Sequence, residues 1–259
     1  MSDQDCYSIV DKPEILSFAF YPRKDYTPGP PNSTDYSIPV ERDISVSCRF
    51  YVQSQDSPLI LFFHGNGEVA SDYDYIAPTY NRQGINLCVA DYRGYGSSGG
   101  TPTFRNTVED SHPIFKAFWE ILRDNNYSGG LFVMGRSLGS VPAIELASRH
   151  PQHIKGLIIE SGFASLLRGF SHLGIPLEAF GLTDVEFPNL AKIRNVTLPT
   201  LIIHGEHDTL IPVSEARDLF QNSGAKDKRL VIISHADHND VMVSGIQQYF
   251  TAIAEFVFA

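Results

Sequence analysis

The sequence GRSLG at residues 135–139 has the residue types of a sharp turn that exposes a serine hydroxyl. It follows the apolar run Leu131–Met134 directly and leads into a helical pattern that ends near His150. Glycines at both ends permit a tight, strained backbone, and the N-terminus of the following helix contributes partial positive charge. A serine that only caps a helix would fit the same letters, but the strand and helix on either side indicate that Ser137 is a nucleophile.

A serine hydroxyl is a poor nucleophile at neutral pH, so Ser137 needs a base and an acid that orients the base. Asp208 follows the apolar run Thr200–Ile203, and His238 follows the run Leu230–Ile233. Because the carboxyl ends of parallel strands converge at one edge of a sheet, we expect both side chains to lie near Ser137. His238 would accept the proton of Ser137, and Asp208 would hold the other ring nitrogen.

Two alternatives for the base and the acid remain open. His235 lies three residues before His238 and is a second candidate for the base, although it is closer to the strand. Glu160 ends the run Gly156–Ile159 and offers a second place for the acid. We favour Asp208 over Glu160 because the loop that carries Asp208 has room to reach the histidine.

The tetrahedral intermediate of acyl transfer needs hydrogen-bond donors aimed at its oxygen. The backbone N–H of Leu138, directly after the nucleophile, is one candidate. The sequence HGNG at residues 64–67 follows the first buried strand pattern, and its glycines would let the backbone approach a substrate. We expect the N–H of Asn66 to be the second donor, with Gly65 as the neighbour that could substitute for it. A simple glycine turn is the alternative interpretation.

The elements that must position these residues are short apolar runs that alternate with helical patterns after residue 58. Continuous apolar runs are typical of strands covered on both faces, as in a parallel sheet flanked by helices. The expected strands are 59–63, 85–90, 131–134, 156–159, 200–203 and 230–233, and the expected helices are 71–82, 105–125, 138–150, 213–222 and 241–258. Before them, alternating apolar and polar residues over 43–52 predict a half-exposed strand in an antiparallel edge hairpin.

This alternation predicts an α/β fold with a mostly parallel, eight-stranded sheet between two layers of helices. We expect an N-terminal segment over residues 1–35 and a single catalytic domain over residues 36–259. Glycines and prolines interrupt the interval 164–190, which we interpret as a small cap inserted into that domain. Its apolar residues could line an acyl pocket or simply pack the cap onto the sheet; they are Leu166, Leu167, Phe170, Leu173, Ile175, Leu177, Phe180 and Leu182.

Five motifs together resemble the serine α/β-hydrolase superfamily from about residue 36 onwards. They are HGNG at 64–67, DYRGYGSSG at 91–99, GRSLG at 135–139, HGEHD at 204–208 and HND at 238–240. With its small cap, the chain looks most like a compact subset that includes acyl-protein thioesterases and many esterases. The resemblance implies Ser137 as nucleophile, Asp208 as acid and His238 as base. The chain lacks the cysteine cluster of the depalmitoylating members, so generic ester or thioester hydrolysis is the expected activity.

Charge and hydropathy argue against several other classes. The formal net charge is −10 and no dense run of lysine or arginine occurs, so we expect no binding to nucleic acid or to anionic membranes. No apolar run approaches the roughly 20 residues of a membrane-spanning helix, and residues 1–10 carry no secretory pattern. The cysteines are too widely spaced for a disulfide framework or a metal pattern, so we expect a cytoplasmic protein.

No cofactor or metal is expected. The spacing of Gly94, Gly96 and Gly99 fits a dinucleotide-binding motif, but the acidic residue that should end a second strand lies within a helical pattern. The cluster at 204–208 is dense enough to suggest metal ligands, but hydrolysis by this mechanism needs no metal, and Asp208 already has a role. The negative charge favours neutral small-molecule esters, thioesters or amides as substrates. A small-peptide serine peptidase and a non-catalytic binding module are the alternatives, and the oligomeric state stays open.

Overall fold

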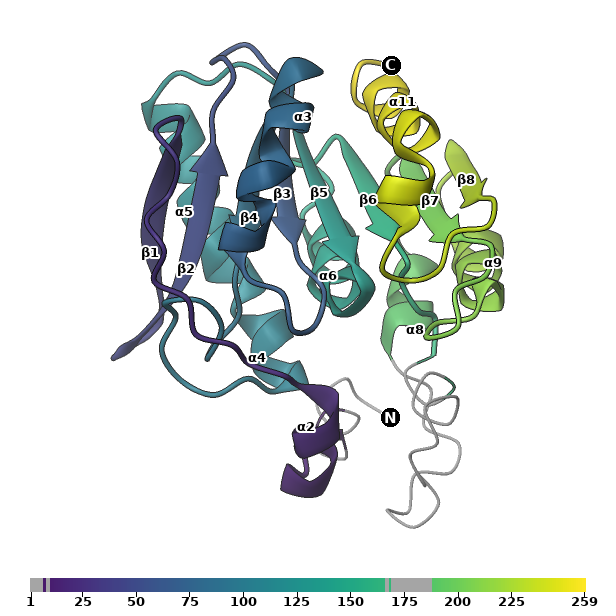
Figure 1. The fold of residues 1–259 in the computed structure, drawn as a ribbon, viewed down its shortest axis with the longest axis horizontal. Helices are drawn as coiled ribbons and strands as arrows, with labels where there is room; N and C mark the ends of the chain where they lie inside the picture. The colour runs from purple at the N-terminus through teal and green to yellow at the C-terminus, as the bar shows by residue number, and fades with distance from the viewer. Residues whose placement is uncertain (1–6, 8–9, 166–167, 169–187) are drawn as a thin grey trace.

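The computed structural model describes residues 7, 10–165, 168 and 188–259. Eight strands form one sheet in the order β1-β2-β4-β3-β5-β6-β7-β8 (Figure 1). β1 pairs with β2, and β2 with β4, in antiparallel register, and the remaining neighbours pair in parallel. The strands are β1 (Ser33–Glu41), β2 (Ile44–Tyr51), β3 (Leu59–Phe63), β4 (Asn86–Ala90), β5 (Leu131–Arg136), β6 (Gly156–Glu160), β7 (Thr200–Gly205) and β8 (Lys228–Ile233). The expected eight-stranded, mostly parallel α/β sheet is therefore confirmed.

Helices cover both faces of the sheet (Figure 1). Apolar side chains of α2, α4, α5, α6, α8 and α9 join one buried cluster, and those of η1, α3, α10 and α11 join another. Strand side chains alternate between the two, so Leu61 belongs to the first cluster and Phe62 to the second. The helices are α2 (Pro13–Ala19), α3 (Ala77–Arg82), α4 (Phe104–Glu109), α5 (Ser111–Asp124), α6 (Ser140–Arg149), α8 (Pro188–Ile193), α9 (Val213–Asn222), α10 (Val241–Ser244) and α11 (Ile246–Val257), with 3-10 turns η1 (Ala70–Tyr75) and η2 (Ser137–Gly139).

Three segments that the sequence predicts as single helices are each divided in two. Pro78 lies in the first turn of α3, so that helix starts anew after η1. Pro113 lacks an N–H and its ring would clash with the carbonyl of Glu109, where α4 ends. Gly245 separates α10 from α11, and a Cβ there would lie 2.3 Å from Cγ2 of Ile233. In the described part of the chain, no helix has both the length and the apolar character needed to cross a membrane.

The segment expected to form a cap lies largely outside the described residues, and so do all the side chains expected to line an acyl pocket. The described residues at its two ends are connected to the body of the fold. The N–H groups of Ala164 and Ser165 donate to Oε2 of Glu215 on α9 at 2.9 and 2.8 Å. The side-chain amide of Asn189 on α8 donates to the carbonyl of Phe163 at 2.9 Å. The chain therefore leaves and re-enters the described fold at neighbouring points.

A buried ion pair joins α6 to α8. Glu145 is 4% exposed, and its Oε2 lies 2.5 Å from Nζ of Lys192. Burial raises the pKa of Glu145, but the hydrogen bond from His112 and the charges of Lys192 and Arg149 outweigh this effect and lower the pKa to about 2. The ionised carboxylate therefore stabilises the packing of α8 against the helix that begins at the serine turn.

We expect Glu145→Gln to lower the free energy of unfolding at pH 7 by about 3 kcal/mol, because it removes the negative charge beside buried Lys192. The folded-state pKa lies below the unfolded value of about 4.3, so the stabilisation is present above that value and is lost as the pH falls toward 2. Urea unfolding of both proteins at pH 7, 5 and 3.5 measures this difference, which should be constant from pH 7 to 5 and smaller at pH 3.5. An equal difference at pH 7 and pH 3.5 would show that the charge of Glu145 does not stabilise the fold.

Candidate active site

The chain turns sharply between β5 and α6, with Ser137 at the turn. Ser137 has a φ of +52°, a left-handed conformation that is unfavourable for a residue with a side chain. The flanking glycines are required by close approach: a Cβ on Gly135 would lie 2.0 Å from the carbonyl oxygen of Gly139, and one on Gly139 would lie 2.0 Å from that of Phe63. The turn therefore packs against the end of β3 and presents the serine at the carboxyl edge of the sheet.

Ser137, His238 and Asp208 form one chain of hydrogen bonds. Nε2 of His238 lies 3.1 Å from Oγ of Ser137, and Nδ1 of His238 lies 2.8 Å from Oδ2 of Asp208. All three residues are buried. Because Nδ1–H donates to the carboxylate, Nε2 is left as an acceptor for the serine hydroxyl. The structure thus brings together the three residues that the sequence predicts as nucleophile, base and acid.

Asp208 is held in its ionised form by its neighbours. Burial raises the pKa of Asp208, but hydrogen bonds from His204 and His238 outweigh this effect and hold the pKa well below its ordinary value. Its Oδ1 also accepts the N–H groups of Leu210 and Ile211 at 3.0 and 2.7 Å. An ionised carboxylate at this position accepts the Nδ1–H of His238 and fixes the orientation of its ring.

His204 is a residue whose role the sequence reasoning missed. Its Nε2 donates to the carbonyl of Ile211 at 2.8 Å and lies 3.2 Å from Oδ2 of Asp208. His204 is therefore a second histidine against the same carboxylate, not an exposed metal ligand. The sequence signal was a histidine within a buried strand that is otherwise apolar.

The two alternatives for base and acid occupy other positions. His235 is exposed, and its N–H donates to the carboxylate of Glu206 at 3.1 Å. Glu160 is buried, and its carboxylate accepts from Nε of Arg136 at 3.2 Å and from the hydroxyl of Tyr249 at 2.7 Å. The residue that is hydrogen-bonded to Ser137 is His238, and the carboxylate that is hydrogen-bonded to His238 is Asp208.

The side chain of Asn66 connects the loop after β3 to the N-terminal segment. Its Oδ1 accepts the N–H of Tyr21 at 3.0 Å and the hydroxyl of Tyr95 at 2.6 Å. Its Nδ2 donates to the carbonyl of Ala19 at 2.9 Å. These three bonds hold the Asn66 side chain between the N-terminal segment and Tyr95, and the oxyanion role expected of Asn66 belongs to its backbone N–H.

The backbone N–H groups expected to stabilise an oxyanion differ in their partners. The N–H of Gly65 already donates to Oε2 of Glu68 at 2.8 Å, so it would have to break this bond to reach a substrate oxygen. Within the described residues, the N–H of Asn66 has no hydrogen-bond acceptor. Leu138 is the second residue of η2, where an N–H precedes the first intrahelical bond. Asn66 and Leu138 are therefore better candidates than Gly65.

Arg136, the residue before the serine, is a second residue whose role the sequence reasoning missed. It is buried and forms an ion pair through Nη1 with Glu68 and through Nε with Glu160 at 3.2 Å. Its Nη2 donates to the carbonyl of His238 at 2.9 Å and to the side chain of Asn239 at 3.2 Å. Arg136 and Glu160 both end apolar runs in the sequence, but only the structure shows that they pair in register on adjacent strands.

We expect Arg136→Met to lower the free energy of unfolding by about 3 to 5 kcal/mol, because two carboxylates then lose the buried cation that neutralises them. The matched control is Arg229→Met, which removes an ion pair between Arg229 and Glu255 whose side chains are 50% and 55% exposed. That change should cost less than about 1 kcal/mol. Urea unfolding at pH 7 measures both, and losses of similar size would contradict a special role for Arg136.

Comparison with known proteins gives one family match and several relatives. The family model described as serine aminopeptidase, S33, matches residues 54–176 and 187–242. Human alpha/beta hydrolase domain-containing protein 17B is 32% identical over 220 residues, which cover 82% of this chain and 70% of that protein. The protein of the same name from Xenopus laevis is 33% identical over 205 residues, which cover 76% of this chain and 65% of that protein.

Solved structures share the fold at low sequence identity. The esterase Pf2001 of Pyrococcus furiosus superposes with a TM-score of 0.74 at 19% identity, over 92% of this chain and 98% of that chain. A monoacylglycerol lipase of Paleococcus ferrophilus superposes with a TM-score of 0.62 at 18% identity, over 82% of this chain and 98% of that chain. Since the family match spans more than half of the sequence, this chain is an α/β-hydrolase and belongs to the hydrolase family described as serine aminopeptidase, S33.

Proposed function

We propose that this chain is a serine hydrolase that cleaves carboxylic esters or thioesters through an acyl-enzyme on Ser137. The observation that carries the proposal is the chain of hydrogen bonds from Ser137 through His238 to Asp208. The strained turn supports the same role, because a left-handed serine between two close-packed glycines is costly without a function.

The reaction proceeds in two steps, acylation of Ser137 and hydrolysis of the acyl-enzyme. In the first, Oγ of Ser137 attacks the substrate carbonyl carbon while its proton passes to Nε2 of His238, and Asp208 stabilises the imidazolium. Collapse of the tetrahedral intermediate breaks the bond to the alcohol or thiol, which takes the proton from His238. In the second step, water attacks the acyl carbon and gives a proton to His238, which returns it to Ser137 as the carboxylic acid leaves.

The N–H groups of Asn66 and Leu138 are the donors that we assign to the oxyanion. Each such donor contributes about 3 kcal/mol to transition-state stabilisation. The loop of Asn66 is fixed by its side-chain bonds, so its N–H requires little reorganisation when charge develops on the substrate oxygen. Gly65 is the weaker candidate, because its N–H already donates to Glu68.

The charges around the turn favour esters and thioesters over peptides with a free amino terminus. An aminopeptidase, the activity in the family description, needs an acceptor for the ammonium group of its substrate. Three buried or half-buried carboxylates, Glu68, Glu160 and Asp208, lie against the turn or its histidine, and each is already paired with arginine or histidine. The net charge of −10 is a separate argument, and it disfavours anionic substrates.

We expect a fluorophosphonate probe to label the parent chain at neutral pH and to leave Ser137→Ala unlabelled, because the probe bonds to an activated serine hydroxyl. In the same variant, kcat for p-nitrophenyl esters and acyl thioesters should fall by roughly three or more powers of ten. In-gel fluorescence measures the labelling, and absorbance of the released phenol or thiol measures the rate.

The matched control for that experiment is Ser148→Ala on α6, which should be labelled like the parent. Labelling of Ser137→Ala at the parental level would refute the proposal. A folded parent that is not labelled would favour the non-catalytic binding module. Aminoacyl p-nitroanilides belong in the same assay, since faster turnover of these amides than of the esters would reassign the chain to the peptidases.

We expect His238→Ala to lower kcat for the same esters by several powers of ten, because the proton of Ser137 then has no acceptor. The loss should exceed that of His235→Ala by roughly a hundredfold or more, since His235 is exposed and bonded elsewhere. Steady-state kinetics of both variants measure the two losses in kcat, and a larger loss in His235→Ala would identify His235 as the base instead.

A further inference from the structure

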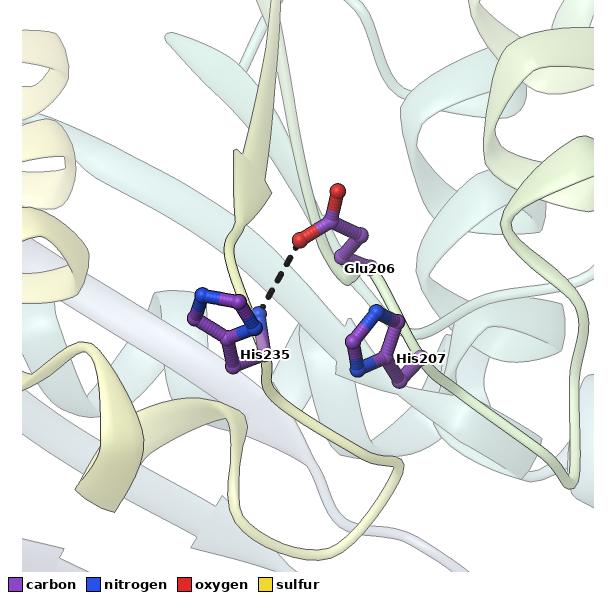
Figure 2. A group of neighbouring side chains, drawn as sticks. All are labelled: Glu206, His207 and His235. Carbon is purple, nitrogen blue, oxygen red and sulfur yellow. Dashed lines mark hydrogen bonds between the residues drawn. The ribbon is translucent and has the colours of Figure 1, made fainter.

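Glu206, His207 and His235 form an exposed cluster next to the loops of the acid and the base (Figure 2). Glu206 and His207 follow β7, and His235 follows β8. The three side chains each offer one ligand atom, and these atoms all lie within 4.8 Å of one another. All three are exposed, and the reaction proposed for Ser137 uses none of them.

Backbone hydrogen bonds join the two loops that carry the cluster. The N–H of Glu206 donates to the carbonyl of Ile233 at 2.9 Å, and the N–H of His207 donates to that of Ala236 at 2.9 Å. In the opposite direction, the N–H of His235 donates to the Glu206 carboxylate at 3.1 Å (Figure 2). The three side chains of the cluster therefore lie on loops whose backbones stay hydrogen-bonded to each other beyond the ends of β7 and β8.

The donor set has the chemistry of a zinc site with an open position. Two imidazoles and one carboxylate are common ligands of Zn²⁺, with water in the remaining position. The rings of His207 and His235 have centroids 5.5 Å apart at 64°, so they are not stacked face to face. A tetrahedral ion with bonds of about 2.1 Å separates its ligand atoms by about 3.4 Å. The distances between the ligand atoms must therefore shorten by about 1.4 Å at most, and rotation of these exposed side chains can supply that change.

The cluster differs from the one visible in the sequence. The motif HGEHD at residues 204–208 suggests His204 and Asp208 as companions of Glu206 and His207. In the fold both of those residues are buried and bonded to each other, and His235 from the neighbouring loop takes their place. The fold thus separates a buried pair that serves the base from an exposed group that faces solvent.

We propose that Glu206, His207 and His235 bind a divalent ion of the zinc type, which links the loop of Asp208 to the loop of His238. Asp208 directly follows His207, and His238 is three residues after His235, so a bound ion restrains the two loops relative to each other. Imidazole nitrogen selects Zn²⁺ and Co²⁺ over Mg²⁺ and Ca²⁺, which prefer oxygen ligands.

The test uses the full chain without a polyhistidine tag, because such a tag binds the same ions. Competition with a chromophoric zinc indicator should show one Zn²⁺ per chain, and thermal unfolding should move to higher temperature with Zn²⁺ but not with Mg²⁺. His207→Ala, His235→Ala and Glu206→Gln should each weaken Zn²⁺ binding by more than about tenfold, since loss of even an indirect partner costs that much. His153→Ala, which removes an exposed histidine elsewhere, should bind Zn²⁺ like the parent.

Bound Co²⁺ provides a second readout. Its visible absorption reports nitrogen ligands and should disappear in the two histidine variants, while circular dichroism shows that both remain folded. Parental affinity for Zn²⁺ in all three variants would overturn the site, and so would a folded parent that binds no Zn²⁺ at millimolar concentration. The readout is binding, so the result does not depend on hydrolysis at Ser137.

Discussion

The buried guanidinium of Arg136 is the contact on which the rest of the site depends. It connects the serine turn to the loop after β3 through Glu68, to the end of β6 through Glu160, and to the loop of the base through the carbonyl of His238. A buried charge is stable only while its partners stay in place, so each of these segments is held at a fixed position. The bond between His238 and Ser137 follows from this arrangement, because Arg136 is covalently attached to the serine and bonded to the backbone of the histidine.

Backbone strain is concentrated at the same edge of the sheet. Three residues with side chains have positive φ within two residues of the end of a parallel strand: Ser137 after β5, Ser161 after β6 and His235 after β8. Such conformations persist only where the surrounding structure holds them. Here the tightly packed glycines, the ion pairs and the bonds between loops supply that support. The edge that carries the candidate site therefore holds three of the four non-glycine residues with positive φ in the described backbone.

The sequence predicts the sheet and the hydrogen-bonded set of Ser137, His238 and Asp208 well, because both follow from local patterns. Continuous apolar runs mark strands buried on two faces, and the glycines around Ser137 mark a turn that only small residues permit. The partners of Arg136, the second histidine on Asp208 and the approach of His235 to Glu206 depend instead on strand order and register, which periodicity does not reveal. The divided helices have two kinds of cause. Pro78 and Pro113 begin new helices for a local reason, whereas Gly245 is required by close approach to Ile233 on β8.

The three bonds of the Asn66 side chain have a consequence for motion. Asn66 is held by Ala19 and Tyr21, residues of a segment that precedes the first strand of the sheet. Segments outside a sheet open at lower free energy than its central strands. Partial opening of residues 19–21 would remove two of the three bonds of the Asn66 side chain, while the bond from Tyr95, β3, β5 and the serine turn stay in place. The two halves of the proposed oxyanion site thus have different supports, because the Asn66 loop is held in part by the N-terminal segment, whereas Leu138 lies on the turn between β5 and α6.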